Sequence, residues 1–127
     1  MRVLIVDDDD DMRKVIRATL EPLTHDLHEA RNAIDALKVA RAERPDFVIL
    51  DIMMPGVDGY EICYLIKTAP ELKHTRVIIL TVRRNEIDIS IGRGALADAY
   101  LLKPLTPGRL LGAIEKLEGG ERGRFLQ

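Results

Sequence analysis

The sequence predicts an α/β protein built on a parallel sheet. Short apolar runs alternate with helical patterns five times along the chain, and parallel neighbours need crossover connections that are usually helical. The runs at residues 3–6 and 47–50 are apolar at every position, as is typical of strands that helices cover on both faces. With 127 residues, the chain has room for one domain.

The first predicted strand, residues 3–6, belongs in the middle of the sheet because all of its side chains are apolar. An amphipathic helix should follow it, with Asp11 as its N-cap and Pro22 marking its end. The apolar spacing that predicts this helix is carried by Met12, Val15, Ile16, Thr19, Leu20 and Leu23.

Residues 25–30 are short and polar for a strand, so we expect them at an edge of the sheet. A second helix should end near Pro45. Its apolar positions are Ile34, Leu37 and Ala40. The strand at 47–50 then ends on Asp51 and is followed by residues typical of a loop, among them Pro55 and Gly56.

The second half of the chain continues the alternation. A third helix is predicted from Ile62, Leu65, Ile66 and Ala69. Strands are predicted at residues 77–80 and from residue 100 to 102. The last helix has the clearest signals, with Thr106 at the N-cap, Pro107 at the first helical position and Gly119 at the C-terminal end.

Residues 86–91 alternate polar and apolar residues with a period of two, which locally indicates a strand. We predict a helix instead, because the crossover between two parallel neighbours is right-handed and usually helical. Ile87 and Ile91 would then share one helical face. Gly92 and Gly94 weaken such a helix by about 1 kcal/mol each, so we expect it to be the least stable element.

Polar residues follow the predicted strands at the points where they end. Asp7 and Asp8 follow the first strand, Asp51 and Thr81 end later ones, and Lys103 follows the last. In an open parallel sheet these ends meet where ligands bind. Like charges about 4 Å apart repel by about 4 kcal/mol per pair, so a cation is needed there. Carboxylate oxygens without His or Cys ligands favour Mg²⁺.

Composition excludes several classes of protein. The formal charge of −2 provides no positive field that would attract nucleic acid or an anionic membrane. No apolar run approaches the ~18 to 20 residues that a membrane span needs. The single cysteine, Cys63, excludes an internal disulfide framework and is expected in the core, which agrees with a cytoplasmic protein.

The residues at the strand ends resemble those of the receiver domain of two-component response regulators. The resemblance rests on five motifs in order: Asp7-Asp8, the run from Asp51 to Gly59, Thr81, Tyr100 and Lys103-Pro104. It covers about residues 2–118. It implies a doubly wound, flavodoxin-like sheet of five strands in the order 2-1-3-4-5, flanked by five helices, with the site between strands one and three.

The resemblance also implies a role for each residue of the site. Asp51 would be the phosphoacceptor, and Lys103 would bind the phosphoryl group. Mg²⁺ would be held directly by Asp8, Asp51 and the backbone carbonyl of Met53, with Asp7 acting through a water molecule. Phosphoryl transfer passes through a loose transition state, so these groups mainly position the reactants and neutralise charge.

Two further pairs of residues would control the signal. The Thr81 hydroxyl would donate to a phosphoryl oxygen, and Tyr100 would move from an exposed to a buried position behind it. Met53 and Arg83 would set water access and therefore the lifetime of the acyl phosphate. The resemblance thus implies that the protein is a signalling switch rather than an enzyme. Its own chemistry would be limited to self-phosphorylation and autodephosphorylation.

The implied partners are a sensor histidine kinase or phosphotransfer protein, a downstream effector protein or domain, and a second copy of the chain after phosphorylation, with no direct binding of nucleic acid. Residues 1–118 would form the receiver domain, and residues 119–127 a tail or the start of a linker.

Two alternatives remain. A phosphatase of the haloacid-dehalogenase type also uses an aspartyl nucleophile after its first strand, and Asp7 and Asp9 have the corresponding spacing, although Asp11 stands where that family expects Thr. The other alternative is a receiver-like interaction module that is never phosphorylated.

Overall fold

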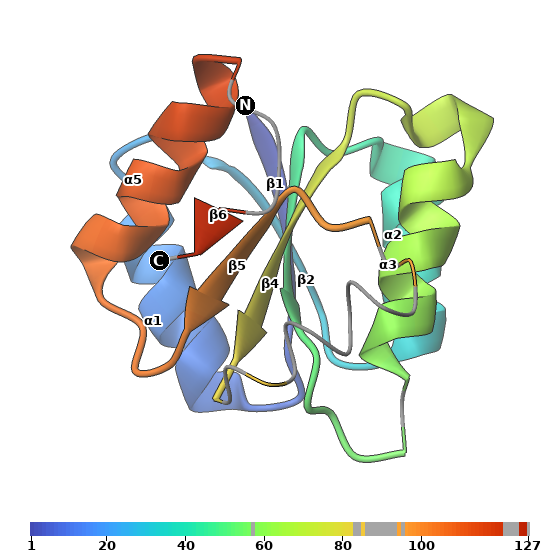
Figure 1. The fold of residues 1–127 in the computed structure, drawn as a ribbon, viewed down its shortest axis with the longest axis horizontal. Helices are drawn as coiled ribbons and strands as arrows, with labels where there is room; N and C mark the ends of the chain where they lie inside the picture. The colour runs from blue at the N-terminus through green and yellow to red at the C-terminus, as the bar shows by residue number, and fades with distance from the viewer. Residues whose placement is uncertain (57, 83–84, 86–93, 95, 121–124, 127) are drawn as a thin grey trace.

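The computed structural model describes residues 1–56, 58–82, 85, 94, 96–120 and 125–126. Its sheet is parallel throughout, with the strands in the order β2-β1-β3-β4-β5-β6 (Figure 1). The strands are β1 (Arg2–Val6), β2 (Asp26–Ala30), β3 (Phe47–Asp51), β4 (Arg76–Thr81), β5 (Ala99–Leu102) and β6 (Phe125–Leu126). The first five confirm the predicted order 2-1-3-4-5. The two-residue β6, which the sequence did not predict, adds a sixth strand beside β5.

Helices cover both faces of this sheet. On one face lie α1 (Asp10–Leu20) and α5 (Pro107–Glu118), and on the other α2 (Ala33–Glu43) and α3 (Gly59–Thr68) (Figure 1). A single 3₁₀ turn, η1 (Pro70–Leu72), joins α3 to β4. The predicted helix around residues 86–91 lies outside the described residues.

The sheet separates two layers of hydrophobic core. Along β1 the side chains alternate, so that Val3 and Ile5 pack toward α1 and α5 whereas Leu4 and Val6 pack toward α2 and α3. All four are at most 1% exposed, which confirms that this strand is central. Burial of each such side chain stabilises the fold by about 1.5–3 kcal/mol. Cys63 is also buried in the core, as expected.

The helix boundaries differ from the prediction at one point that matters for the site. Helix α1 begins at Asp10 and is capped by Asp9, whose side chain accepts a hydrogen bond from the Asp11 N–H at 2.9 Å. The prediction of Asp11 as N-cap was therefore wrong by two residues. The reason is that three successive aspartates can each serve as a cap, and the length of the loop after β1 selects the first. Thr106 caps α5 as predicted.

Some residues predicted for the buried faces of helices are exposed. Ile34 is 70% exposed and Val15 50%, because α1 and α2 bury narrower stripes than the apolar spacing suggested. Leu23 is 48% exposed because it lies beyond the end of α1 at Leu20. In α2 the buried positions are Ala36 and Ala40, whose small side chains bring the helix close to the sheet.

A partly buried ion pair joins α3 to the amino ends of β4 and β5. Lys67 Nζ lies 2.8 Å from Asp98 Oδ2 and donates a second hydrogen bond of 3.0 Å to the Thr75 carbonyl. The same Asp98 oxygen accepts a hydrogen bond of 2.8 Å from the Val77 N–H. This network fixes the amino ends of β4 and β5, opposite the edge where the strands end.

We predict that Gly59→Ala destabilises the protein. A Cβ atom at this position would lie 2.8 Å from the Ile52 Cα atom, so the loop between β3 and α3 would have to shift. Overpacking of this kind costs about 1–3 kcal/mol in the free energy of unfolding, measured by urea denaturation. The control is Gly112→Ala in α5, where a Cβ meets nothing within 4 Å. That change should stabilise the helix by up to about 1 kcal/mol, and equal effects of the two changes would contradict the steric explanation.

Candidate functional site

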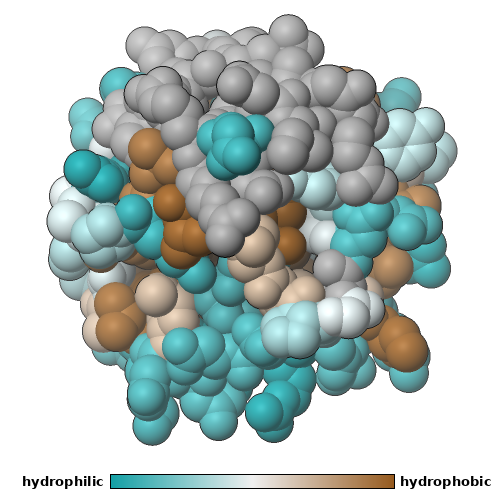
Figure 2. Space-filling view, turned by 60° about the horizontal axis from the view of Figure 1, so that its bottom comes forward, coloured by the Kyte–Doolittle hydropathy of each residue, from teal (hydrophilic) through white to brown (hydrophobic). Residues whose placement is uncertain are grey.

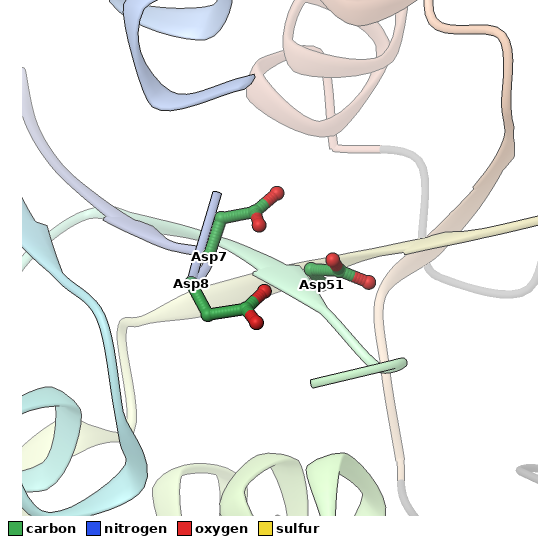
Figure 3. A group of neighbouring side chains, drawn as sticks. All are labelled: Asp7, Asp8 and Asp51. Carbon is green, nitrogen blue, oxygen red and sulfur yellow. The ribbon is translucent and has the colours of Figure 1, made fainter. Parts of the chain in front are cut away.

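Three carboxylates meet at the carboxyl edge of the sheet. Asp7 and Asp8 follow β1, and Asp51 ends the neighbouring β3, so adjacent parallel strands deliver all three side chains to one place (Figure 3). One oxygen from each of them lies within 4.8 Å of the others. The edge lies where the strand order reverses between β1 and β3, which is where open α/β sheets bind ligands.

The backbone orients two of these carboxylates. The Asp9 N–H donates to Asp7 Oδ1 and the Met53 N–H donates to Asp51 Oδ1, each at 2.9 Å. Asp7 is 1% exposed and Asp51 5%, whereas Asp8 is exposed. Among the described residues nothing pairs with the buried Asp7 Oδ2. An ionised oxygen that is buried without a partner is costly, and a bound cation removes that cost.

The pKa of Asp7 reflects the cost of burying negative charge in this pocket. Burial, which disfavours the charged form, raises the pKa of Asp7 from 3.8 to about 6, and the negative charge of Asp51 adds to the shift. The hydrogen bond from Asp9 and the positive charge of Lys103 act in the opposite direction. Without a cation, the pocket therefore holds a proton more tightly than an exposed carboxylate does.

Lys103 provides the positive charge on the other side of Asp51. Its Nζ lies 3.3 Å from Asp51 Oδ2, and its backbone N–H donates to the Thr81 carbonyl at 2.8 Å. The side chain is 19% exposed, so its ammonium group is only partly hydrated. Asp51 thus stands between the two other carboxylates and one lysine.

The donor set of the pocket fits Mg²⁺. Three carboxylates supply hard oxygen ligands, and the exposure of Asp8 leaves room for water molecules, which Mg²⁺ usually retains. The unpaired Asp7 oxygen gives the pocket an unsatisfied acceptor that a cation would fill. Met53 lies beside the pocket, with 43% of the residue exposed.

The remaining predicted site residues lie in different surroundings. Thr81 and Tyr100 are buried, at 1% and 2% exposure, on the neighbouring strands β4 and β5. The structure shows Tyr100 in a buried position, and its expected move from an exposed position stays a prediction. Arg83 lies outside the described residues. Figure 2 shows hydrophilic side chains over much of this edge of the molecule, with smaller hydrophobic areas between them.

Sequence reasoning missed one residue of the site. Arg13, on α1, donates from Nη1 to the backbone carbonyl of Asp7 at 2.7 Å. Its guanidinium also contacts Asp10 and Glu29. No sequence motif signals this contact, because the Glu29 carboxylate comes from the edge strand β2.

The structure disfavours the phosphatase alternative. That mechanism needs a second aspartate, here Asp9, beside the nucleophile after the first strand. The Asp9 side chain is instead occupied as the cap of α1. It does not belong to the group formed by Asp7, Asp8 and Asp51.

A doubly wound parallel sheet with an acidic pocket at its switch point and a lysine after its fifth strand defines a receiver-type α/β fold. The family profile described as "Response regulator receiver domain" matches residues 3–115, and the chain belongs to this family. It is a receiver domain of two-component response regulators and a signalling switch.

Similar proteins and solved structures match more than nine-tenths of the chain. "Transcriptional regulatory protein AfsQ1" of Streptomyces coelicolor is 38% identical over 94% of this chain and 52% of its own length. "Protein PilG" of Pseudomonas aeruginosa is 36% identical over 91% and 85%. The chemotaxis response regulator CheY4 of Vibrio cholerae superposes with a TM-score of 0.82 at 28% identity, over 91% of this chain and 97% of that one.

The chain spans about half the length of several curated relatives, such as AfsQ1 and ResD of Bacillus subtilis. Similarly, the match to the response regulator DrrB of Thermotoga maritima, with a TM-score of 0.82 and 31% identity, covers 96% of this chain and 54% of that one. Among the described residues, every helix lacks the length and apolar character needed to cross a membrane.

We predict that Asp7→Asn stabilises the metal-free protein at pH 7. A carboxyl group with a raised folded-state pKa binds its proton more tightly when folded, so its contribution to stability falls as the pH rises from 3.8 to about 6. The variant carries no charge there and should be more stable at pH 7 by up to about 3 kcal/mol, because the pKa shift is about two units and each unit corresponds to about 1.4 kcal/mol.

Urea denaturation in EDTA across this range measures the difference in free energy of unfolding. The advantage of the variant should shrink below pH 3.8, where Asp7 is protonated in both folded and unfolded wild type. When excess Mg²⁺ replaces EDTA at pH 7, it should stabilise the wild type more than the variant. A difference that does not change with pH would show that Asp7 is not the titrating group.

Proposed function

We propose that Asp51 accepts a phosphoryl group from a phosphohistidine of a sensor kinase or phosphotransfer protein. An Asp51 oxygen attacks phosphorus, the P–N bond breaks, and its electron pair stays on the imidazole nitrogen, which takes up a proton. The product is an acyl phosphate on Asp51. The observation that carries the proposal is the position of Asp51, with Lys103 Nζ 3.3 Å away on one side and two further carboxylates on the other.

Mg²⁺ supports this chemistry by drawing together oxygens that repel one another and by neutralising negative charge on the phosphoryl group. Asp8, Asp51 and the backbone carbonyl of Met53 would hold it directly, with Asp7 acting through a bound water. The burial of Asp7 and its unpaired oxygen support this assignment. With its pKa raised to about 6, Asp7 is mostly charged at neutral pH, and a bound cation would balance that charge.

Lys103 and Thr81 bind the transferred group in this proposal. The ammonium of Lys103 stabilises charge on an equatorial phosphoryl oxygen, since little covalent assistance is required in a loose transition state. The Thr81 hydroxyl donates to another oxygen, and Tyr100 packs behind it. Their places on adjacent strands, paired Thr81↔Leu102 with Tyr100 two residues before Leu102, support a coupled movement.

Hydrolysis of the acyl phosphate ends the signal. Water attacks phosphorus, the P–O bond to Asp51 breaks, and the carboxylate is regenerated with release of inorganic phosphate. Met53 and Arg83 would control how easily water enters. The exposure of Met53 at the pocket supports its part in this role.

The signal passes to an effector protein or domain, and phosphorylation produces a homodimer. The length comparison supports an effector domain, since relatives such as AfsQ1 are about twice as long. Residues 1–118 act as the receiver, and residues 119–127 act as its tail or as the start of a linker. The whole process takes place in the cytoplasm. Comparing the size of the protein with and without beryllofluoride, a phosphoryl mimic, tests the dimer.

The central test uses a small phosphoryl donor, acetyl phosphate, with Mg²⁺. Intact mass spectrometry should show one added phosphoryl group in the wild type and none in Asp51→Asn, and EDTA should prevent the addition. Asp46→Asn is the matched control, because Asp46 precedes the strand that Asp51 ends and lies at its opposite edge. Equal modification of Asp51→Asn and wild type would refute the assignment.

A second test separates Lys103 from the metal ligands. Lys103→Met should slow phosphorylation by about 100-fold, as loss of a preorganised cation at the reacting group does. Mg²⁺ binding should become tighter, because the pocket loses a positive charge near its carboxylates. Lys38→Met, on the exposed surface of α2, should change neither quantity. Weakening of both together would mean that Lys103 only holds the pocket in shape.

A further inference from the structure

Arg13 links three elements around the acidic pocket. It lies in the first turns of α1, and its side chain is only 12% exposed. Nη1 donates to the Asp7 carbonyl at 2.7 Å, and Nε donates to Glu29 on β2 at 2.9 Å. Nη2 contacts the Asp10 carboxylate. The guanidinium therefore uses all three of its nitrogens, one toward each element.

These contacts complete the restraint of the Asp7 backbone. The Asp7 N–H donates to the Ala30 carbonyl of β2 at 3.1 Å, and the Asp7 carbonyl accepts from Arg13. The side chain is held by the hydrogen bond from the Asp9 N–H. Within the described part of the chain, Oδ2 is the one polar atom of Asp7 without a hydrogen-bond partner, so the restraint decides where this oxygen lies relative to Asp8 and Asp51.

Such a restraint is needed because the three carboxylates repel one another. Repulsion acts to move the loop that carries Asp7 and Asp8 away from Asp51, and that loop follows the end of β1. A hydrogen bond from a guanidinium is shorter and stronger than a neutral one, and the planar group cannot rotate toward one partner without losing another. Arg13 is thus suited to keep the loop in place before any cation binds.

We propose that Arg13 is a positioning residue for the metal site, which holds the backbone at Asp7 so that Asp7 and Asp8 meet Asp51. The proposal rests on the proposed function, because it concerns the same pocket. Among the described contacts, Arg13 meets the pocket through the backbone carbonyl of Asp7 and not through the three carboxylates.

Arg17 provides the matched control. It lies one turn further along α1, and its Nη1 is 3.7 Å from the same Glu29 carboxylate, but no hydrogen bond joins it to the loop after β1 among the described contacts. Arg13→Ala and Arg17→Ala each remove one positive charge from the same helix. A difference between them therefore reports the hydrogen bonds of Arg13, of which the one to the Asp7 carbonyl reaches the pocket, rather than the loss of charge.

The experiment measures the dissociation constant of Mg²⁺ by isothermal titration calorimetry on the full chain, with circular dichroism to confirm folding. Arg13→Ala should raise the constant by about tenfold or more, the usual effect of losing a residue that orients metal ligands. Arg17→Ala should stay within about twofold. Phosphorylation by acetyl phosphate should need more Mg²⁺ in Arg13→Ala but recover most of its rate at saturating Mg²⁺.

Arg13→Lys keeps the outcome interpretable if the alanine variant does not fold. A lysine ammonium can donate to the Asp7 carbonyl but not to all three partners at once, so its dissociation constant should lie between those of wild type and the alanine variant. Unchanged Mg²⁺ affinity in a folded Arg13→Ala or, failing that, in Arg13→Lys would overturn the proposal. Failure of the wild type to bind Mg²⁺ would instead refute the metal site itself, and this inference with it.

Discussion

Electrostatic repulsion within the acidic pocket is the constraint on which the rest of the structure depends. Oxygens of Asp7, Asp8 and Asp51 lie within 4.8 Å of one another, and two of the residues are almost fully buried. The apolar strands on which they stand supply the stability that offsets this repulsion, since residues of β1 and β3 are buried on both faces. The sheet therefore holds the three carboxylates close together although their charges repel one another.

The stored repulsion is also what makes the pocket responsive. A buried carboxylate is destabilised without a cation, so a bound cation stabilises it strongly. The raised pKa of Asp7 means that protons and a metal ion compete for the same carboxylate. Lys103 offsets part of the charge but is tied to Asp51 at 3.3 Å, so a new anion at that position would compete for the same ammonium. Binding, charge and the position of Lys103 are thus coupled through Asp51.

Apolar runs in the sequence were sufficient to mark the strands and the polar residues at their ends, because parallel strands end at one edge. The strand order came from the resemblance of those residues to receiver domains. Asp7, Asp8, Asp51 and Lys103 could therefore be brought together before any coordinates. Contacts between distant side chains could not. Arg13 reaches Glu29 across the edge of the sheet, and neither residue belongs to a motif. Ile34 is exposed because alanines, which carry little hydrophobic signal, make the contact of α2 with the sheet. The brief pairing of β6 with β5 follows a run of glycine and charged residues that predicts no strand.

The ion pair between Lys67 and Asp98 has a mechanical consequence. It clamps the amino ends of β4 and β5 to each other and to α3, far along the strands from Thr81 and Lys103. The two strands are thus tied to a helix at their amino ends, whereas at their carboxyl ends the backbone hydrogen bond from the Lys103 N–H to the Thr81 carbonyl joins them to each other.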